Sequence, residues 1–124
     1  EKVVLPYHLD ALKQAAGVLA LEHGAEMRDR VEALVSERGR VVAAFGDLAV
    51  SHWPSGANFV LFRPDEVPGG VLWQRLVDRG VLVRDCSSWP GLTDCLRVTI
   101  GTPEENDAFL AALGESLSVP ARDA

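Results

Sequence analysis

The sequence predicts an α+β domain with a long N-terminal helix or helix pair, a small three- to four-stranded mixed sheet and a C-terminal helix packed on one face. Two observations carry this prediction. Apolar residues recur with a helical period in the first half of the chain and alternate in the second half. A strong helix-start signal then lies near residue 102. We expect one domain over residues 1–117 and a disordered tail over residues 118–124.

The first half is expected to be helical. Its first stripe falls at positions i, i+3, i+7 and i+10, and consists of Leu9, Leu12, Ala16 and Leu19. Gly24 interrupts this run, and a second stripe follows it, formed by Met27, Val31, Leu34, Val35 and Val42. The region 9–43 is therefore predicted to be either one bent helix or two helices.

The second half is predicted to hold the sheet. Short apolar segments bounded by turn residues predict strands at 49–52, 57–63, 81–84 and 96–100. A short helix is expected between the second and third strands, at 71–79, with Gly80 ending it as the C′ residue. Hairpin and βαβ-like connections coexist in this arrangement, so we expect mixed strand pairing.

The closing helix has three start signals in a row. Thr102 can cap it, Pro103 suits its first position, and Glu105 lies three residues after the cap. An apolar stripe follows, made of Phe109, Leu110, Leu113 and Leu117. We therefore expect this helix to bury one face on the sheet.

Composition excludes several classes of partner. The net charge of −6 argues against a nucleic-acid partner, because such binding neutralises phosphates with basic residues. No apolar run reaches the roughly 20 residues that a membrane helix needs. Since no signal peptide is visible, we expect a cytoplasmic protein. The chain begins with Glu1 rather than Met, so we expect a fragment or a processed product of a longer protein.

The potential metal ligands are scattered. Cys86 and Cys95 lie nine residues apart, a spacing that matches no metal pattern, so we expect free thiols with a disulfide as the alternative. His8, His23 and His52 have no neighbouring ligands, and we expect no metal site. Gly-rich phosphate loops, a Gly-x-Ser-x-Gly elbow and a Cys–His nucleophile pair are also missing from the sequence. The chain is therefore not expected to be an enzyme by itself.

Two arginines are candidates for binding an anion. Arg97 lies in the middle of the alternating strand 96–100 and must point away from its apolar face. Arg84 ends the strand 81–84, and a ten-residue loop over 85–94 separates the two strands. If both strands end at one cleft, two guanidinium groups can hold a carboxylate or a phosphate. The competing interpretation is that both arginines lie on an ordinary solvated face.

Four segments resemble the C-terminal part of histidinol-phosphate aminotransferases. They are residues 5–16 (LPYHLDALKQAA), 55–61 (SGANFVL), 80–86 (GVLVRDC) and 95–110 (CLRVTIGTPEENDAFL). The resemblance implies the small domain of a fold-type-I aminotransferase, a homodimeric enzyme that uses pyridoxal phosphate. It implies amino transfer between histidinol phosphate and 2-oxoglutarate in histidine biosynthesis.

The resemblance also implies roles for three residues. Arg97 matches an arginine that binds the anionic end of the substrate, and Arg84 matches one that helps to hold the substrate phosphate. Asn58 could organise the nearby strand edge at the site, with a structural role of its side chain as the alternative. The family's Schiff-base lysine stands in a Ser-x-x-Lys context, and neither Lys2 nor Lys13 has that setting. No catalytic or cofactor-binding residue is therefore carried over. The missing large domain is expected to hold pyridoxal phosphate, and the chain alone is expected to be inactive.

Two alternatives remain open. The chain could be the small domain of a threonine-phosphate decarboxylase, which shares the two-arginine tail. It could also be a free-standing interaction or regulatory domain that descends from an aminotransferase. In the free-standing case, an apolar patch on the first helix would be the partner surface. If the chain is instead a domain separated from its large domain, the outer face of that helix would be exposed or would self-associate, so we expect a homo-oligomer.

Overall fold

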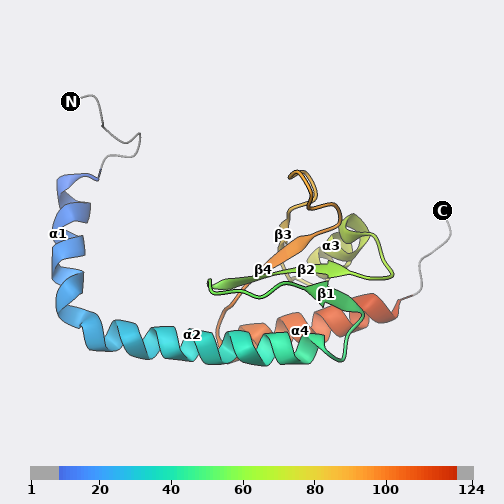
Figure 1. The fold of residues 1–124 in the computed structure, drawn as a ribbon, viewed down its shortest axis with the longest axis horizontal. Coiled ribbons are helices and arrows are strands. Elements are labelled where there is room, and N and C mark those ends of the chain that lie inside the picture. Colours follow the sequence, from blue (N-terminus) through green and yellow to red (C-terminus); the bar gives the residue numbers. More distant parts are fainter. Residues whose placement is uncertain (1–8, 120–124) are drawn as a thin grey trace. The chain divides into compact units, whose positions relative to one another are not determined.

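The computed structural model describes residues 9–119, and the chain divides between Glu32 and Ala33 into two compact units. The elements of both are drawn in Figure 1. Within these residues no helix is both long enough and apolar enough to cross a membrane. The expected single domain over 1–117 stays a prediction. Of the expected tail, Ser118 is the last residue of a helix, while residues 120–124 lie outside the described residues.

The first unit is helical over residues 11–32, as predicted. Helix α1 (Ala11–Ala20) begins at Asp10, whose carboxylate accepts a hydrogen bond from the Lys13 backbone N–H at 2.9 Å. A single 3₁₀ turn, η1 (Leu21–His23), separates α1 from α2 (Gly24–Phe45). The helical run is therefore two α-helices, and the predicted interruption at Gly24 is the first residue of the second one. Every residue of α1 is exposed in this chain.

The second unit contains a four-stranded sheet in the order β1-β2-β4-β3. The strands are β1 (Val50–His52), β2 (Phe59–Pro64), β3 (Arg84–Asp85) and β4 (Leu96–Thr99). All three neighbouring pairs are antiparallel, so the prediction of a mixed sheet is wrong. The connection from β2 through α3 to β3 does have a βαβ-like form. However, β4 lies between these two strands and runs antiparallel to both.

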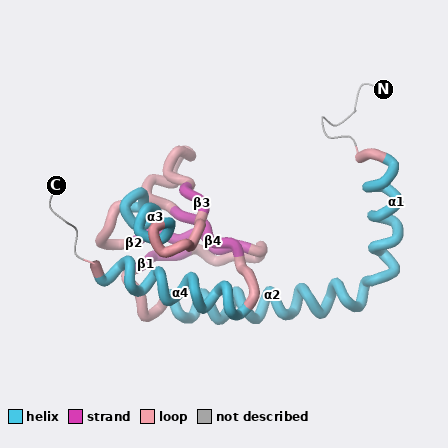
Figure 2. Tube along the Cα trace, turned by 180° about the vertical axis from the view of Figure 1, so that it is seen from behind, coloured by secondary structure: helices cyan, strands magenta, loops and turns pink. Residues whose placement is uncertain are grey.

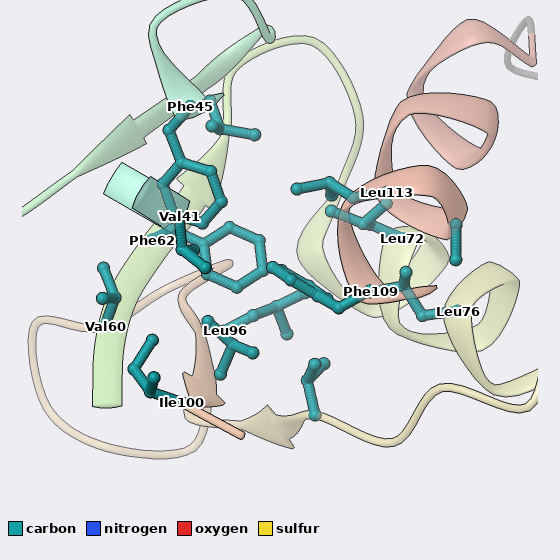
Figure 3. Close-up of a cluster of buried hydrophobic side chains, with 14 of the residues drawn as sticks. Val41, Phe45, Val60, Phe62, Leu72, Leu76, Leu96, Ile100, Phe109 and Leu113 are labelled. Carbon is teal, nitrogen blue, oxygen red and sulfur yellow. The ribbon is translucent and has the colours of Figure 1, made fainter. Parts of the chain in front are cut away.

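One face of the sheet builds the core with three helices, α2, α3 (Gly69–Val77) and α4 (Pro103–Ser118). Figure 2 shows the same elements from behind. Phe62 of β2 is fully buried, and its ring centroid lies 5.3 Å from that of Phe45 on α2 and 6.0 Å from that of Phe109 on α4. Leu72 and Leu113 approach the same cluster from α3 and α4 (Figure 3). Tilted and edge-on aromatic contacts of this kind add to the burial energy.

The buried stripe of α2 differs from the predicted one. Val41 and Phe45 are buried, with 0% and 1% of their surface exposed. Met27, Val31 and Val35 are 56%, 49% and 46% exposed. Only the C-terminal part of α2 packs on the sheet, which the apolar period could not indicate because it continues along the whole helix.

Helix α3 starts two residues before the predicted position. The carboxylate of Asp94 accepts a hydrogen bond from the Gly69 N–H at 2.8 Å, which satisfies a backbone donor at the helix start. The Asp94 backbone is also so close that a Cβ on Gly69 would lie 2.5 Å from its carbonyl oxygen. The helix ends at Val77, two residues before the predicted end at 79, and the predicted Gly80 closes the turn that follows. Gly80 has φ +77°, its N–H bonds to Val77, and the next N–H bonds to Leu76, as in a Schellman motif.

The start of α4 confirms the predicted capping box. The Thr102 hydroxyl accepts a bond from the Glu105 N–H at 3.3 Å, and the Glu105 carboxylate accepts one from the Thr102 N–H at 2.8 Å. Asn106 is buried just behind this cap. It donates to Glu37 on α2 at 2.8 Å and exchanges bonds with both backbone groups of Gly101. This network fixes the corner between β4 and α4 against α2.

Candidate functional site

The two arginines singled out from the sequence are neighbours in the structure. Arg84 on β3 and Arg97 on β4 are Cα partners in the antiparallel ladder. Side chains of directly opposed residues leave the sheet on the same face. Arg84 begins β3 instead of ending a strand over 81–84, so the predicted strand was placed too early. The pairing nevertheless places the two arginine side chains on the same face of the sheet.

Arg97 lies on the sheet face that does not build the core. Its neighbours Leu96 and Val98 are buried in the core, which confirms the predicted alternation. Its guanidinium carbon lies 4.7 Å from the centroid of the Phe59 ring, a cation–π contact that holds the side chain on β2. Its Nε is buried and has no hydrogen-bond partner among residues 9–119. A buried donor without a partner carries a desolvation cost that an anionic ligand could offset.

Both arginines line one open pocket of about 440 Å³ at the β3 edge of the sheet. Asp85 and Thr99 add polar groups to its wall, while Trp73 on α3 provides an aromatic side. The full lining consists of Trp73, Leu82, Val83, Arg84, Asp85, Arg97 and Thr99. Two guanidinium groups and one carboxylate leave a net positive charge, so the pocket suits a carboxylate or a phosphate.

Asn58 is not brought to this pocket. It precedes β2, its side chain is exposed, and its backbone oxygen accepts a hydrogen bond from the Ile100 N–H at 2.8 Å. Along β2 the residue opposite Arg97 is Leu61, three positions away. In this structure Asn58 therefore extends the β2–β4 ladder through its backbone.

Trp73 is the pocket residue that the sequence reasoning missed. It belongs to the predicted short helix, where its spacing from Leu76 is typical of an ordinary apolar stripe. The structure shows it half-buried, with its indole N–H 3.0 Å from the Val83 carbonyl oxygen. Nothing in the local sequence pattern indicates that its ring reaches the strand that carries Arg84.

The cysteines are next to the pocket but do not line it. The Cys86 N–H donates to the Cys95 carbonyl at 2.9 Å, which extends the β3–β4 ladder by one step. Both thiols are free and buried, as the favoured prediction held. Burial raises the pKa of the Cys95 thiol, so it stays protonated near neutral pH. Within the described part of the chain, no group of three or more His, Cys, Asp and Glu side chains could hold a metal ion.

The residues present do not fit pyridoxal phosphate. That cofactor requires a lysine for its Schiff base, and Lys13 is the one lysine among residues 9–119. Its side chain is 65% exposed and forms an ion pair of 2.8 Å with Asp10 at the start of α1. A solvated amine in such a pair lacks the enclosed setting of a Schiff-base lysine.

The fold and the arginine pair define an α+β domain with a cationic pocket at one sheet edge. Residues 1–113 match the family model described as aminotransferase class I and II. The chain therefore belongs to the class I and II aminotransferase family.

Individual proteins similar to the chain are mainly enzymes that act on phosphate-bearing amino compounds, by their names. The chain is 48% identical over 117 residues to the histidinol-phosphate aminotransferase of Corynebacterium glutamicum, covering 94% of this chain and 31% of the relative. The histidinol-phosphate aminotransferase structure from Clostridium acetobutylicum matches with a TM-score of 0.81 and 23% identity, over 90% of this chain and 34% of that one. At that identity the likeness is one of fold. The L-threonine-O-3-phosphate decarboxylase from Porphyromonas gingivalis matches with a TM-score of 0.69 and 26% identity, over 90% of this chain and 35% of that one.

Proposed function

We propose that the chain is the C-terminal substrate-binding domain of a pyridoxal-phosphate-dependent histidinol-phosphate aminotransferase. The parent enzyme would transfer an amino group between histidinol phosphate and 2-oxoglutarate in histidine biosynthesis. The observation that carries the proposal is the pairing of Arg84 with Arg97 in one pocket, on a chain 48% identical to an enzyme of that name. The chain spans about a third of the length of that relative. Cofactor binding and the chemistry of amino transfer would therefore need the rest of the protein.

The two arginines suit the alternating substrates of such a reaction. The enzyme must accept a phosphate ester and a dicarboxylate in turn at the same place. A guanidinium group forms two parallel hydrogen bonds to either anion, because its fork matches two oxygens of a carboxylate or a phosphate. The Phe59 ring packs against the guanidinium group of Arg97. Because Arg97 is half-buried, its interaction with an anion is stronger than it would be in water. The role of these residues is thus to bind and orient the substrate.

The cofactor would belong to the rest of the protein. When bound, pyridoxal phosphate supplies the electron sink for amino transfer. In the proposal the large domain holds it, the enzyme is a homodimer, and the protein works in the cytoplasm. Two free, buried thiols support a reducing compartment. The exposed side chains of Leu9, Leu12 and Leu19 on α1 and just before it support a neighbour for that helix in the complete enzyme.

A phosphate-specific decarboxylase is the second candidate. It is supported by the structural match to L-threonine-O-3-phosphate decarboxylase at 26% identity, slightly higher than the 23% of the matched aminotransferase structure. A phosphate-binding arginine pair would serve both reactions equally well. The two candidates differ in their products, which are imidazole acetol phosphate and glutamate for the amino transfer, and carbon dioxide and an amine for the decarboxylation.

The experiment is an assay of the full-length protein that contains this chain, loaded with pyridoxal phosphate. Amino transfer from histidinol phosphate to 2-oxoglutarate and release of carbon dioxide from threonine phosphate are measured side by side. We expect the first activity, and we expect Arg97→Ala to raise the KM for both substrates by about 10-fold or more. The matched control is Arg63→Ala, because Arg63 is exposed and lies outside the pocket. Absence of amino transfer, or unchanged KM values in the Arg97 variant, would contradict the proposal.

A further inference from the structure

We infer that Trp73 is a positioning residue for Arg84, acting through the backbone of the strand that carries it. The inference rests on the proposed function, because it concerns the same anion-binding pair. The contact that suggests it is the hydrogen bond from the indole Nε1 of Trp73 to the carbonyl oxygen of Val83, at 3.0 Å. Val83 immediately precedes Arg84 in the chain.

The strand that holds Arg84 is short, and its backbone partner in the sheet is β4 alone. β3 contains two residues and lies at the edge of the sheet, and residues 81–83 before it have no regular structure. An edge strand presents one row of backbone groups without a strand partner. Val83 is 5% exposed, so an unbonded carbonyl at this position would be costly. Trp73 satisfies that carbonyl from a neighbouring helix.

This bond also constrains where Arg84 points. The carbonyl of Val83 and the N–H of Arg84 belong to one planar peptide unit. Fixing the carbonyl direction therefore limits the rotation of the plane from which the Arg84 side chain departs. Trp73 is itself held firmly, since its helix neighbour Leu72 is fully buried and Leu76 accepts the bond that closes the helix end. The ring lines the same pocket as Arg84 and Arg97.

If Trp73 had a purely structural role, an aromatic ring without an N–H group could replace it. Trp73→Phe keeps an aromatic side chain on the core and removes the donor, so it separates the two roles. A second variant carries β-(3-benzothienyl)alanine at position 73, which keeps the size of the ring system and replaces N–H by sulfur. The matched control is Trp53→Phe, because Trp53 directly follows β1 at the opposite edge of the sheet and its ring contacts Arg63.

The measurement is the steady-state kinetics of the full-length, cofactor-loaded enzyme. We expect both Trp73 variants to raise the KM for histidinol phosphate about three- to tenfold, with kcat within about twofold of the wild type. We expect Trp53→Phe to change neither constant. A structural role would lower the thermal midpoint or the fraction of active enzyme and leave the KM unchanged, and that result would overturn the inference.

A double-mutant cycle with Arg84→Ala tests the route of the effect. If Trp73 acts through Arg84, Trp73→Phe adds nothing to the KM of the Arg84→Ala enzyme. Equal effects in both backgrounds would show that Trp73 acts elsewhere and would overturn the inference. An Arg84→Ala enzyme with a normal KM would instead contradict the proposed function. The two failures are therefore distinguishable.

Discussion

Gly69 and Gly70 are adjacent glycines for which the structure predicts opposite responses to alanine. Both lie in the first turn of α3. A Cβ on Gly69 would lie 2.5 to 2.7 Å from three backbone atoms of Asp94, closer than real Cβ contacts. Around a Cβ on Gly70, no described atom lies within 4 Å. We therefore expect Gly69→Ala to destabilise the chain and Gly70→Ala to stabilise it slightly.

The size of each effect follows from competing contributions. Alanine in place of glycine gains about 0.4–1 kcal/mol, because the unfolded chain loses freedom. At Gly69 the overlap costs about 1–3 kcal/mol if Asp94 stays in place. If Asp94 moves away, the bond of 2.8 Å between its carboxylate and the Gly69 N–H is lost instead, at about 1.5–3 kcal/mol. The net expectation is a loss of about 1–2 kcal/mol for Gly69→Ala and a gain of up to about 1 kcal/mol for Gly70→Ala.

Urea denaturation of the two variants and the wild type measures this difference. With a slope of about 1–3 kcal/mol per molar urea, the midpoint of Gly69→Ala should fall by about 0.3–2 M. The midpoint of Gly70→Ala should stay the same or rise. Equal midpoints for the two variants would refute the close approach of the Asp94 loop to α3. A Gly70 variant less stable than the Gly69 variant would refute it more strongly.

Three further predictions concern the cap, the buried network and the thiols. Thr102→Ala should cost about 1 kcal/mol in urea denaturation and Thr102→Ser much less, because serine keeps the capping hydroxyl. Hydrogen bonds from Arg40 and Asn106 hold the pKa of Glu37 below its ordinary value of 4.5. The stability that the ionised Glu37 contributes is therefore present above pH 4.5 and is lost as the pH falls through the lower pKa of the folded state. Glu37→Gln should therefore lose less stability than the wild type between about pH 5 and 3 in denaturation curves; equal losses would contradict this. Cys86 and Cys95 are 0% and 2% exposed, so Ellman's reagent should react with them only at the rate of unfolding, and immediate reaction in native buffer would show that they are accessible.

The elements predicted well from the sequence are those with local causes. The start of α4 depends on Thr102, Pro103 and Glu105, which lie within four residues and interact with each other. The turn at Gly80 depends on a positive φ that glycine adopts without strain. The alternation of β4 also reflects a local rule, since one face of the strand is buried. Such features need no knowledge of the rest of the chain.

The elements predicted poorly have causes far away in the sequence. Gly69 and Gly70 resemble a loop, and the helix begins there because the carboxylate of Asp94, 25 residues later, accepts the Gly69 N–H. The mixed sheet was predicted because the connection around α3 has a βαβ-like form. The order in which strands pair is a property of the whole sheet, and the insertion of β4 between β2 and β3 leaves no parallel neighbours.

The candidate site depends both on a local sequence rule and on contacts between distant parts of the chain. The alternation of β4 places Arg97 away from the core, so the sequence alone predicts which face it occupies. That Arg84 lies directly opposite depends on register, and a shift of β3 by one residue would turn Arg84 to the other face and bring Asp85 opposite Arg97. With two residues in β3, the ladder alone specifies this register weakly. The neighbouring bonds from Trp73 to Val83 and from Cys86 to Cys95 lie on the two sides of the Arg84–Asp85 strand and therefore fix it. The arginine pair thus depends on contacts that neither arginine makes, which is why the site must be tested at Trp73 as well as at Arg84 and Arg97.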